Sequence, residues 1–242
     1  MTLKYRTKGL IFQKKDRSEA DVSFSIFTED FGRLEVTAKA VKKITSKLRG
    51  GIDLFYFSEI EFIQGKNSKT LTDTTSIKIP IDLYSDLKKF GTACRIADIL
   101  EKFIKGEEKD IKTFYLTLQS LDMVTGNGLK FKNQNLLFQY FFWNFISLQG
   151  YRLAAEKCAA CSGIIRPTDI YFSAKDGGVV CRDCFLKIGK GLKINQDVVK
   201  TLRLILNKNV GVLSKLKIGE PSMGIMENLS TNALEAFSPI HN

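Results

Sequence analysis

The sequence predicts an α+β protein of several domains, with strands at the start of the chain and helices after them. Apolar and polar residues alternate in short runs through residues 1–80, which is the pattern of half-buried strands. From Ile81 onward, apolar residues recur at spacings of three and four, which is typical of amphipathic helices. Two pairs of cysteines interrupt the helical part between residues 158 and 184. A chain of 242 residues has room for two or three small domains.

The strand-rich part divides into about five segments with turn residues between them. A small closed barrel is the expected arrangement, and an oligonucleotide-binding (OB) barrel has this number of strands. We therefore predict an OB-fold barrel domain over residues 1–80. The expected strands are residues 5–14, 22–26, 34–38, 54–62 and 70–79.

A helical domain is predicted for residues 81–242. Its central segment, residues 134–148, is apolar on every side, as expected for a helix buried in the middle of a bundle. Cys94 lies on an apolar stripe, which predicts a buried thiol that packs like a small apolar side chain. The other expected helices cover residues 83–104 and 111–121 and begin, after the cysteines, near Asn195 and Ser222.

The four paired cysteines predict a closed metal site inside the helical domain. They form two Cys-x-x-Cys pairs with nineteen residues between the pairs. Two thiolates at this spacing reach one metal from a tight turn, and a second pair completes the four-sulfur shell that Zn²⁺ takes in structural sites. Redox-active Cys-x-x-Cys normally occurs as a single pair. We therefore predict one structural Zn²⁺ per chain in a module over residues 158–184, with the ligands Cys158, Cys161, Cys181 and Cys184.

The net charge of +11 predicts a polyanionic partner, and two basic stretches outside the cysteine module carry much of it. The first contains five basic residues and no acid between Val36 and Ile52, and we expect it to be a flexible loop that can lie along a phosphate backbone. A solvated loop without a partner is the alternative. The second, residues 187–217, has eight basic residues and one acid. The candidate phosphate contacts are Lys39, Lys42, Lys43, Lys47 and Arg49 in the first stretch, and Lys193, Lys200 and Arg203 in the second.

Few residues support catalysis. The one histidine is His241, and neither a phosphate-binding Walker loop nor a Gly-x-Gly-x-x-Gly fingerprint is present. Asp16, Glu19 and Asp21, or the acids at 107–108, are more typical of solvated surfaces than of Mg²⁺ ligands. We therefore expect a protein that is not an enzyme.

The composition also predicts a cytoplasmic location. The longest apolar run, residues 136–148, is shorter than the ~20 residues that a membrane-spanning helix needs. The first residues lack the apolar core of a signal peptide. Paired cysteines that bind a metal suit a reducing compartment better than a disulfide framework does. No membrane partner is expected.

Several short motifs occur in a fixed order along the chain. Together they resemble the RecO family of bacterial recombination mediator and DNA repair proteins over nearly the whole length. The motifs are Asp16-Arg-Ser-Glu19-Ala-Asp21, Phe27-Thr28-Glu-Asp-Phe-Gly32, Ser46-Lys-Leu-Arg-Gly50, Gly150-Tyr-Arg-Leu153, Phe172-Ser173, Gly177-Gly178 and the two cysteine pairs.

This resemblance implies a protein of the nucleoid that binds single- and double-stranded DNA and anneals complementary strands. It also implies that the protein works with RecR, in some members with RecF, and with the C-terminal tail of the single-strand DNA-binding protein to load RecA. Residues 236–242 lack the basic ending associated with the family. Two other functions remain as alternatives: a zinc-stabilised, Mg²⁺-dependent nuclease, and a zinc-ribbon transcription regulator with a marked sequence preference.

Overall fold

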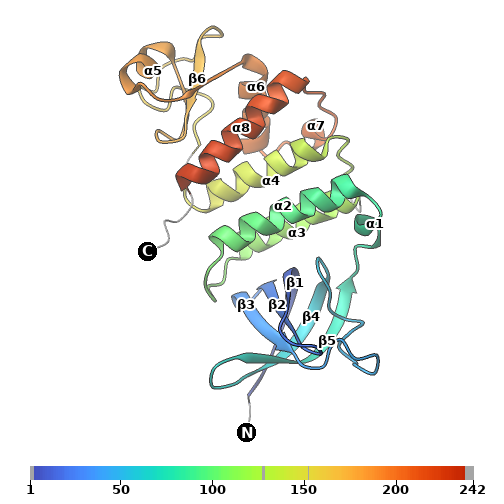
Figure 1. Ribbon diagram of the computed structural model, residues 1–242. Coiled ribbons are helices and arrows are strands. Elements are labelled where there is room, and N and C mark those ends of the chain that lie inside the picture. Colours follow the sequence, from blue (N-terminus) through green and yellow to red (C-terminus); the bar gives the residue numbers. More distant parts are fainter. Residues whose placement is uncertain (1–2, 127–128, 152, 238–242) are drawn as a thin grey trace. The chain divides into compact units, whose positions relative to one another are not determined.

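The computed structural model describes residues 3–126, 129–151 and 153–237 (Figure 1). Arg152 and His241 lie outside the described residues. The chain forms two compact units, Met1–Leu121 and Asp122–Asn242. The described structure changes from strands to helices between Lys78 and Ile81. The division of the chain into domains at residue 80 stays a prediction.

Five strands of the first unit close into a barrel, in the order β1-β2-β3-β5-β4. Neighbouring strands are antiparallel, except that β3 and β5 pair in parallel through two residues only, Val36 and Thr37 on the β3 side. This confirms the predicted α+β class with an N-terminal, OB-like sheet. The strands are β1 (Lys4–Asp16), β2 (Val22–Thr28), β3 (Gly32–Ala38), β4 (Phe57–Gln64) and β5 (Lys69–Lys78).

The fourth strand begins later than predicted. We expected it to start at Leu54, but β4 begins at Phe57. Phe55 has a φ of 62°, a left-handed conformation that breaks an extended strand. The Phe55 side chain is nevertheless buried, and its ring meets the ring of Phe90 edge-on, with the centroids 5.9 Å apart.

Apolar side chains from all five strands fill the barrel. Tyr5 stacks on Phe62 with ring centroids 5.4 Å apart, and Phe31 meets both rings edge-on. Aromatic pairs of this kind contribute about 1 kcal/mol beyond the burial of their area. The buried core consists of Ile11, Val22, Phe24, Ile26, Leu34, Val36, Ala38, Val41, Ile52, Ile60, Phe62 and Leu71.

Helices α1 (Ile81–Tyr84), α2 (Leu87–Phe103) and α3 (Ile111–Thr125) follow the barrel. The Asp86 carboxylate accepts hydrogen bonds from the backbone N–H groups of Lys88 and Lys89 and so fixes the start of α2. Leu87 continues the apolar stripe of the helix predicted over 83–104, but at the first position of α2 it is 89% exposed. Cys94 is half-buried rather than buried.

One arginine links the barrel to α2. Arg33 of β3 donates to the carbonyl oxygen of Ile104 (3.2 Å) and pairs with the Glu101 carboxylate (2.8 Å). Its guanidinium also lies over the Phe12 ring, 5.3 Å from the centroid. The guanidinium also pairs with the Glu35 carboxylate (2.7 Å). Burial alone would lower the pKa of Arg33, but the hydrogen bonds with Glu101 and Glu35 outweigh it and raise this pKa.

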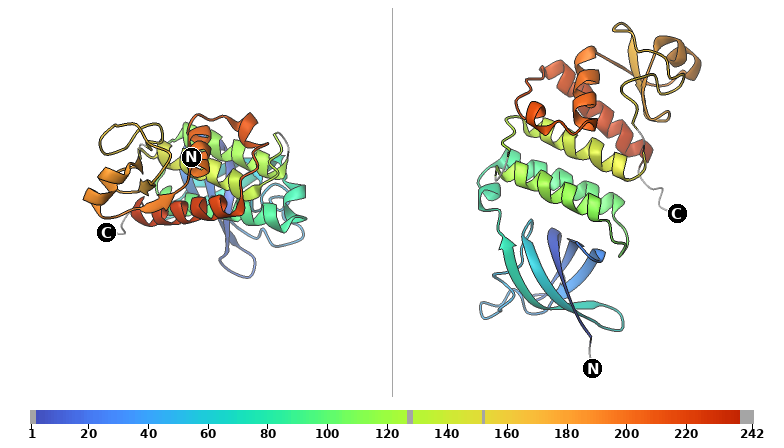
Figure 2. Two further views of the ribbon diagram at one scale, coloured as in Figure 1. Left: turned by 90° about the horizontal axis from the view of Figure 1, so that it is seen from above. Right: turned by 180° about the vertical axis from the view of Figure 1, so that it is seen from behind.

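The second unit is built on α4 (Gln134–Leu148), which is buried over residues 136–146. In both views of Figure 2, α8 (Glu220–Phe237) lies beside α4, and α6 (Gln196–Leu206) also contacts α4. This confirms the prediction of a helix at the centre of a bundle. A four-residue helix, α7 (Val210–Leu213), connects α6 to α8. None of the described helices is long and apolar enough to cross a membrane.

Polar side chains on the buried helix α4 are hydrogen-bonded. Gln139 accepts a hydrogen bond from the Trp143 indole (2.9 Å) and donates one to the Ser230 hydroxyl (3.0 Å). Asn144 donates to the carbonyl oxygens of Tyr140 and Ile205. A buried polar group without a partner costs ~1–3 kcal/mol, so these bonds make the two polar side chains compatible with a buried helix.

The cysteine module follows α4 in the chain and precedes α6. It contains a small antiparallel sheet in the order β7-β6-β8 and one short helix. Phe172 of β6 meets Trp143 of α4 edge-on, with ring centroids 5.6 Å apart, and so packs the module against the bundle. The elements are β6 (Ile170–Ser173), β7 (Gly178–Val180), α5 (Arg182–Ile188) and β8 (Leu192–Ile194).

Candidate metal centre and nucleic-acid interface

The four predicted cysteines come together in one cluster. Their sulfur atoms lie within 4.8 Å of one another, and Cys161 Sγ is 4.0 Å from Cys181 Sγ. All are free thiols. A tetrahedral shell with Zn–S bonds of about 2.3 Å places the sulfurs ~3.8 Å apart, so the donor set and its spacing fit a four-sulfur metal site. Across the residues that the structure describes, no other cluster of metal-ligating side chains occurs.

The two pairs reach this cluster from different local structures. Cys158 begins a tight turn, in which the Ser162 N–H donates to the Cys158 carbonyl oxygen (2.8 Å). Ser162 has a φ of 58°, which lets the chain turn back sharply. Cys181 is the residue before α5, and Cys184 lies in the first turn of that helix. A turn and a helix start thus each present two sulfurs to one point.

Backbone N–H groups stabilise one of the sulfurs as a thiolate. Burial disfavours the Cys158 thiolate, but the N–H groups of Cys181, Cys161 and Ala160 outweigh burial and lower the pKa of Cys158 to about 6. The Cys181 N–H lies 3.4 Å from Cys158 Sγ. Hydrogen bonds with Cys161 and Cys181 raise the pKa of the Cys184 thiol to about 12. Metal ligation requires deprotonated sulfur, and N–H donors of this kind support it.

The chain entering the cluster is fixed by backbone pairing with β7. Ala154 N–H donates to the Gly177 carbonyl oxygen, and Val179 N–H donates to that of Ala154, both at 2.8 Å. Gly178 has a φ of 154°, and a Cβ there would lie 2.2 Å from the Ala154 carbonyl oxygen. This close approach requires glycine, which explains the Gly177-Gly178 motif.

Arg203 holds the same segment from the side of α6. Its Nε donates to the Ala155 carbonyl oxygen (2.9 Å), and it pairs with the Glu156 carboxylate (3.3 Å). Arg203 was predicted as a phosphate contact. Its DNA binding stays a prediction, and these contacts favour a role in holding the module on the bundle.

The other two candidates of the second basic stretch differ from each other. Lys193 of β8 pairs with Asp169 (3.1 Å), which also lies 3.7 Å from Arg182. The hydrogen bond with Asp169 raises the pKa of Lys193. Lys200 is exposed on α6, and the described part of the chain contains no ion pair with it. Both remain predicted DNA contacts, with Lys200 the better placed of the two.

The first basic stretch, residues 39–49, lies between β3 and β4 and forms consecutive turns. The Lys43 N–H donates to the Ala40 carbonyl oxygen (3.1 Å), the Ser46 N–H to that of Lys43 (3.0 Å), and the Arg49 N–H to that of Ser46 (3.4 Å). These hydrogen bonds give the stretch a defined backbone path.

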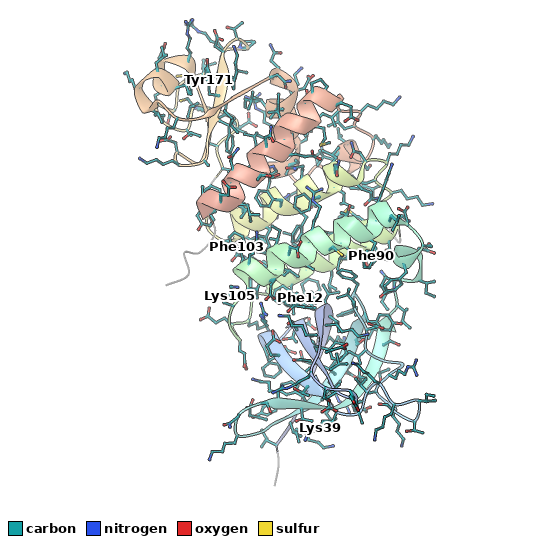
Figure 3. All side chains as sticks on the ribbon, viewed as in Figure 1. Phe12, Lys39, Phe90, Phe103, Lys105 and Tyr171 are labelled. Atoms are coloured by element: carbon teal, nitrogen blue, oxygen red, sulfur yellow. The ribbon has the colours of Figure 1, made fainter. Side chains whose placement is uncertain are left out.

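Apolar side chains fix this basic segment to the barrel. Val41 and, just after the segment, Ile52 belong to the buried core of the barrel, and Leu48 packs against that core. Figure 3 labels Lys39 at the start of the segment. All five basic side chains are exposed. They are Lys39, Lys42, Lys43, Lys47 and Arg49.

Lys42 alone among these five has an acidic partner in the part of the chain that the structure describes. Its ammonium group lies 2.9 Å from the Asp16 carboxylate and 3.3 Å from the Ser18 carbonyl oxygen. The other four cations therefore present unneutralised charge to solvent. Unneutralised cations on an ordered backbone are what phosphate contacts require.

The loop between β1 and β2 is joined to the basic segment. The Asp21 carboxylate accepts a hydrogen bond from the Ala40 N–H (2.7 Å), and the Lys42 N–H donates to the Ala20 carbonyl oxygen (3.2 Å). Arg17, which the sequence did not single out, donates to Thr37 (2.7 Å). Asp16 and Asp21 of the first motif therefore position the segment. OB-type barrels bind oligonucleotides on strands 2 and 3 and on the loops between strands 1 and 2 and between strands 4 and 5, and the first of these loops is the one that contacts the segment.

The second motif also has a structural role. The Thr28 hydroxyl donates to the Gly32 carbonyl oxygen (2.8 Å) and accepts from the Phe31 N–H (3.1 Å), which closes the turn between β2 and β3. Gly32 has a φ of 64°, and a Cβ there would lie 2.2 Å from the carbonyl oxygen of Glu108. Thr28 and Gly32 of this motif therefore shape the turn between β2 and β3.

Two family models match the chain. "Recombination protein O N terminal" covers residues 1–80 and "Recombination protein O C terminal" covers residues 84–236. The DNA repair protein RecO of Dehalococcoides mccartyi is 30% identical over 223 residues, which is 92% of this chain and 86% of that protein. Its namesake in Caldanaerobacter subterraneus subsp. tengcongensis is 26% identical over 88% of this chain and 84% of its own length. The DNA repair protein RecO of Roseiflexus sp. is 25% identical over 93% of this chain and 78% of its own length.

Proposed function

Because the chain belongs to the RecO family of recombination and DNA repair proteins, we propose that it is a DNA-binding recombination mediator and not an enzyme. Its partners would be single- and double-stranded DNA. It would anneal complementary strands and, together with RecR, help to load RecA onto DNA coated by the single-strand DNA-binding protein. The C-terminal tail of that protein, and RecF, are further proposed partners that rest on family membership.

The observation that carries the DNA-binding part of this proposal is the basic segment 39–49. Four exposed cations lie there on an ordered series of turns, without acidic partners in the described part of the chain. Phosphate contacts from such side chains supply most sequence-independent affinity for DNA. A protein that holds backbones without reading bases accepts any pair of complementary strands, which is what annealing demands.

The cysteine cluster is proposed to bind one Zn²⁺ as a structural ion. Four sulfur donors favour zinc over Mg²⁺ or Ca²⁺, which prefer oxygen ligands. Four protein ligands leave no open coordination position, so the bound ion would stabilise the module and take no part in a reaction. Cys158, Cys161, Cys181 and Cys184 would hold it.

Charge reversal in the basic segment tests the DNA site. Lys42 is left unchanged because it pairs with Asp16, so the test variant carries Lys43→Glu and Lys47→Glu. We expect the affinity for a single-stranded oligonucleotide to fall by about tenfold or more. The slope of log K against log salt should become less negative by about 1.5, since two phosphate contacts are lost. Fluorescence anisotropy over a salt series measures both quantities.

The matched control changes the same net charge elsewhere in the first unit. Lys8→Glu and Lys112→Glu alter exposed lysines of β1 and α3, and Lys8 lies eight residues along β1 from Asp16, or ~26 Å of extended chain. The control should bind DNA with nearly the wild-type slope. Equal losses in both variants would mean that net charge alone governs binding. Unchanged affinity in the test variant would place the DNA site elsewhere.

Two assays separate the alternatives. Labelled DNA incubated with the protein and Mg²⁺ should anneal without being cut, whereas cleavage would identify a nuclease. Asp16 and Asp21, which a nuclease would need for its metal, instead contact Lys42 and the Ala40 N–H. Competition among unrelated oligonucleotides should give similar affinities, whereas a strong sequence preference would favour a transcription regulator. A pull-down with RecR and with the tail of the single-strand DNA-binding protein tests the proposed partners.

A further inference from the structure

A single apolar side chain stands at the tip of the basic segment. Ile44 is 90% exposed, more than any other large apolar residue that the structure describes. It occupies the second position of the four-residue turn from Lys43 to Ser46, which is closed by the hydrogen bond from the Ser46 N–H to the Lys43 carbonyl oxygen (3.0 Å). The side chain therefore projects from the apex of that turn.

The fold does not explain an isoleucine at this position. Val41 and Leu48, on either side, already anchor the segment to the barrel core. Tight turns favour Gly, Asn, Asp, Ser and Pro because these residues suit turn dihedrals or bond to the turn's own backbone. Isoleucine does neither, and its exposure to water forgoes the stabilisation that burial of such a side chain contributes.

The charges around Ile44 indicate what would cover it. Lys43 precedes it and Lys47 follows three residues later, both exposed, and no acid occurs between Val36 and Ile52. Cations on both sides of the apex would bind successive phosphates of one strand. The apolar side chain between them would then face the bases rather than the backbone.

We propose that Ile44 inserts as an apolar wedge between two bases of the DNA strand whose phosphates Lys43 and Lys47 bind. Apolar side chains such as Ile, Leu and Met are used in this way to unstack a base step. An isoleucine has no aromatic face on which a base could stack, so it separates bases instead of serving as a stacking platform. The inference rests on the proposed DNA-binding function of this segment.

The wedge has a consequence for the form of DNA that binds best. Unstacking a paired step costs a few kcal/mol, and the cost is smaller where the bases are unpaired or mismatched. The segment should therefore bind flexible single strands more tightly than uniform duplex. A protein-binding site is a poorer fit, because one apolar side chain between Lys43 and Lys47 is far smaller than a typical protein interface.

Fluorescence of 2-aminopurine, which rises when the base is unstacked, tests the proposal. Single-stranded oligonucleotides with 2-aminopurine at each position in turn are saturated with wild-type protein, and we expect a fluorescence increase at one or a few positions. Ile44→Ala should abolish most of that increase and weaken binding by about fivefold, because part of the apolar area that the wedge buries is lost. Ile164→Ala is the matched control, because Ile164 is an almost equally exposed isoleucine (86%) outside the basic segment, and this change should leave the increase and the affinity unchanged.

A second variant separates the wedge from the charges. Ile44→Lys adds a cation, so it should bind DNA at least as tightly at low salt, with a steeper salt slope, and still lack the fluorescence increase. DNA binding by wild-type protein without any fluorescence change, or an undiminished change in Ile44→Ala, would overturn the wedge while leaving DNA binding intact. A wild-type protein that fails to bind DNA would instead overturn the proposed function. Loss of RecR capture by Ile44→Ala with normal fluorescence would reassign Ile44 to a protein contact.

Discussion

The barrel and the cysteine module keep their shape by different means. Each barrel strand contributes side chains to one buried apolar core, in which Phe24 and Phe62 are among the largest. In the module, Phe172, Val179 and Val180 of the small sheet are buried, but α5, every residue of which the structure describes, buries none of its side chains. A segment with so little apolar burial cannot offset the conformational entropy lost on folding, which is why small modules depend on metals or disulfides.

The part of the module from Cys158 to Cys184 differs from the basic segment in charge as well. Residues 158–184 carry equal numbers of acidic and basic residues, and Asp169 in this range lies near both Arg182 and Lys193. Four of the five cations of segment 39–49 have no such partner in the described chain. The most recognisable motif of the sequence is thus proposed to stabilise structure, and a stretch with a much weaker signature is the better candidate for binding.

The largest expected effect is loss of the metal ligands. Replacing Cys181 and Cys184 by serine should remove about one zinc ion per chain and unfold the module, because structural zinc contributes of the order of 10 kcal/mol to the folding of such segments. Metal analysis and hydrogen exchange of residues 155–194 measure the two effects, and barrel amides should keep their protection. Cys94→Ser, outside the cluster, should retain the zinc. If the amides of the module stay protected from hydrogen exchange without metal, the proposed difference between the barrel and the module is wrong.

Truncating the barrel core should have the next largest effect. Phe62→Ala removes a side chain that is 2% exposed and that touches two other aromatic rings, so we expect ~3–5 kcal/mol of lost stability. Urea unfolding followed by near-ultraviolet circular dichroism measures it. Ile77→Ala, at a half-exposed barrel position, should cost much less. Loss of zinc from Phe62→Ala would mean that the barrel and the module do not fold independently.

Periodicity and spacing predicted the parts of this molecule that local sequence determines. The helix at 134–148 and the cap by Asn195 were predicted and are found, because an all-apolar run and a capping side chain act within a few residues. The clustering of the four cysteines could be predicted because a metal shell imposes a characteristic spacing on its ligands.

The partners of individual charges could not be predicted in the same way. From the sequence alone, Arg203 and Lys42 could not be distinguished from basic residues that have no acidic partner. Their contacts with Glu156 and Asp16 join residues 47 and 26 positions apart, and only the folded chain brings these together. Ile44 was overlooked for the same reason, because exposure is a property of the tertiary structure.

Arg203→Ala tests whether the module needs the bundle as well as its metal. The guanidinium donates to a carbonyl oxygen and pairs with Glu156, and charge-assisted hydrogen bonds contribute about 1.5–3 kcal/mol. We expect a loss of stability in that range and an unchanged salt slope of DNA binding. Lys200→Ala, on the exposed side of the same helix, should change stability by less than ~0.5 kcal/mol. If the slope of log K against log salt becomes less negative by about one in Arg203→Ala, Arg203 contacts DNA as first predicted.

Loss of a surface contact in the first unit should change stability least among the four proposed changes. The Asp30 carboxylate accepts hydrogen bonds from the Thr7 hydroxyl (2.9 Å) and the Lys109 ammonium group (3.2 Å), in that order of importance, and they hold the pKa of Asp30 below its usual value. A depressed folded pKa means that this contribution is present above pH ~4 and is lost as the pH falls further.

Replacing Asp30 by asparagine should therefore flatten the decline of stability below pH ~4 and cost less than ~1 kcal/mol at neutral pH, because the half-exposed carboxylate is screened by solvent. Urea unfolding at pH 7 and at pH 3 measures the difference, and Asp82→Asn, another exposed acid of the same unit, is the control. An effect as large as that of Phe62→Ala would mean that this contact, and not the apolar core, limits the stability of the barrel. Burial of apolar side chains would then not be enough to explain the stability of the barrel, and surface electrostatics would have to be added to it.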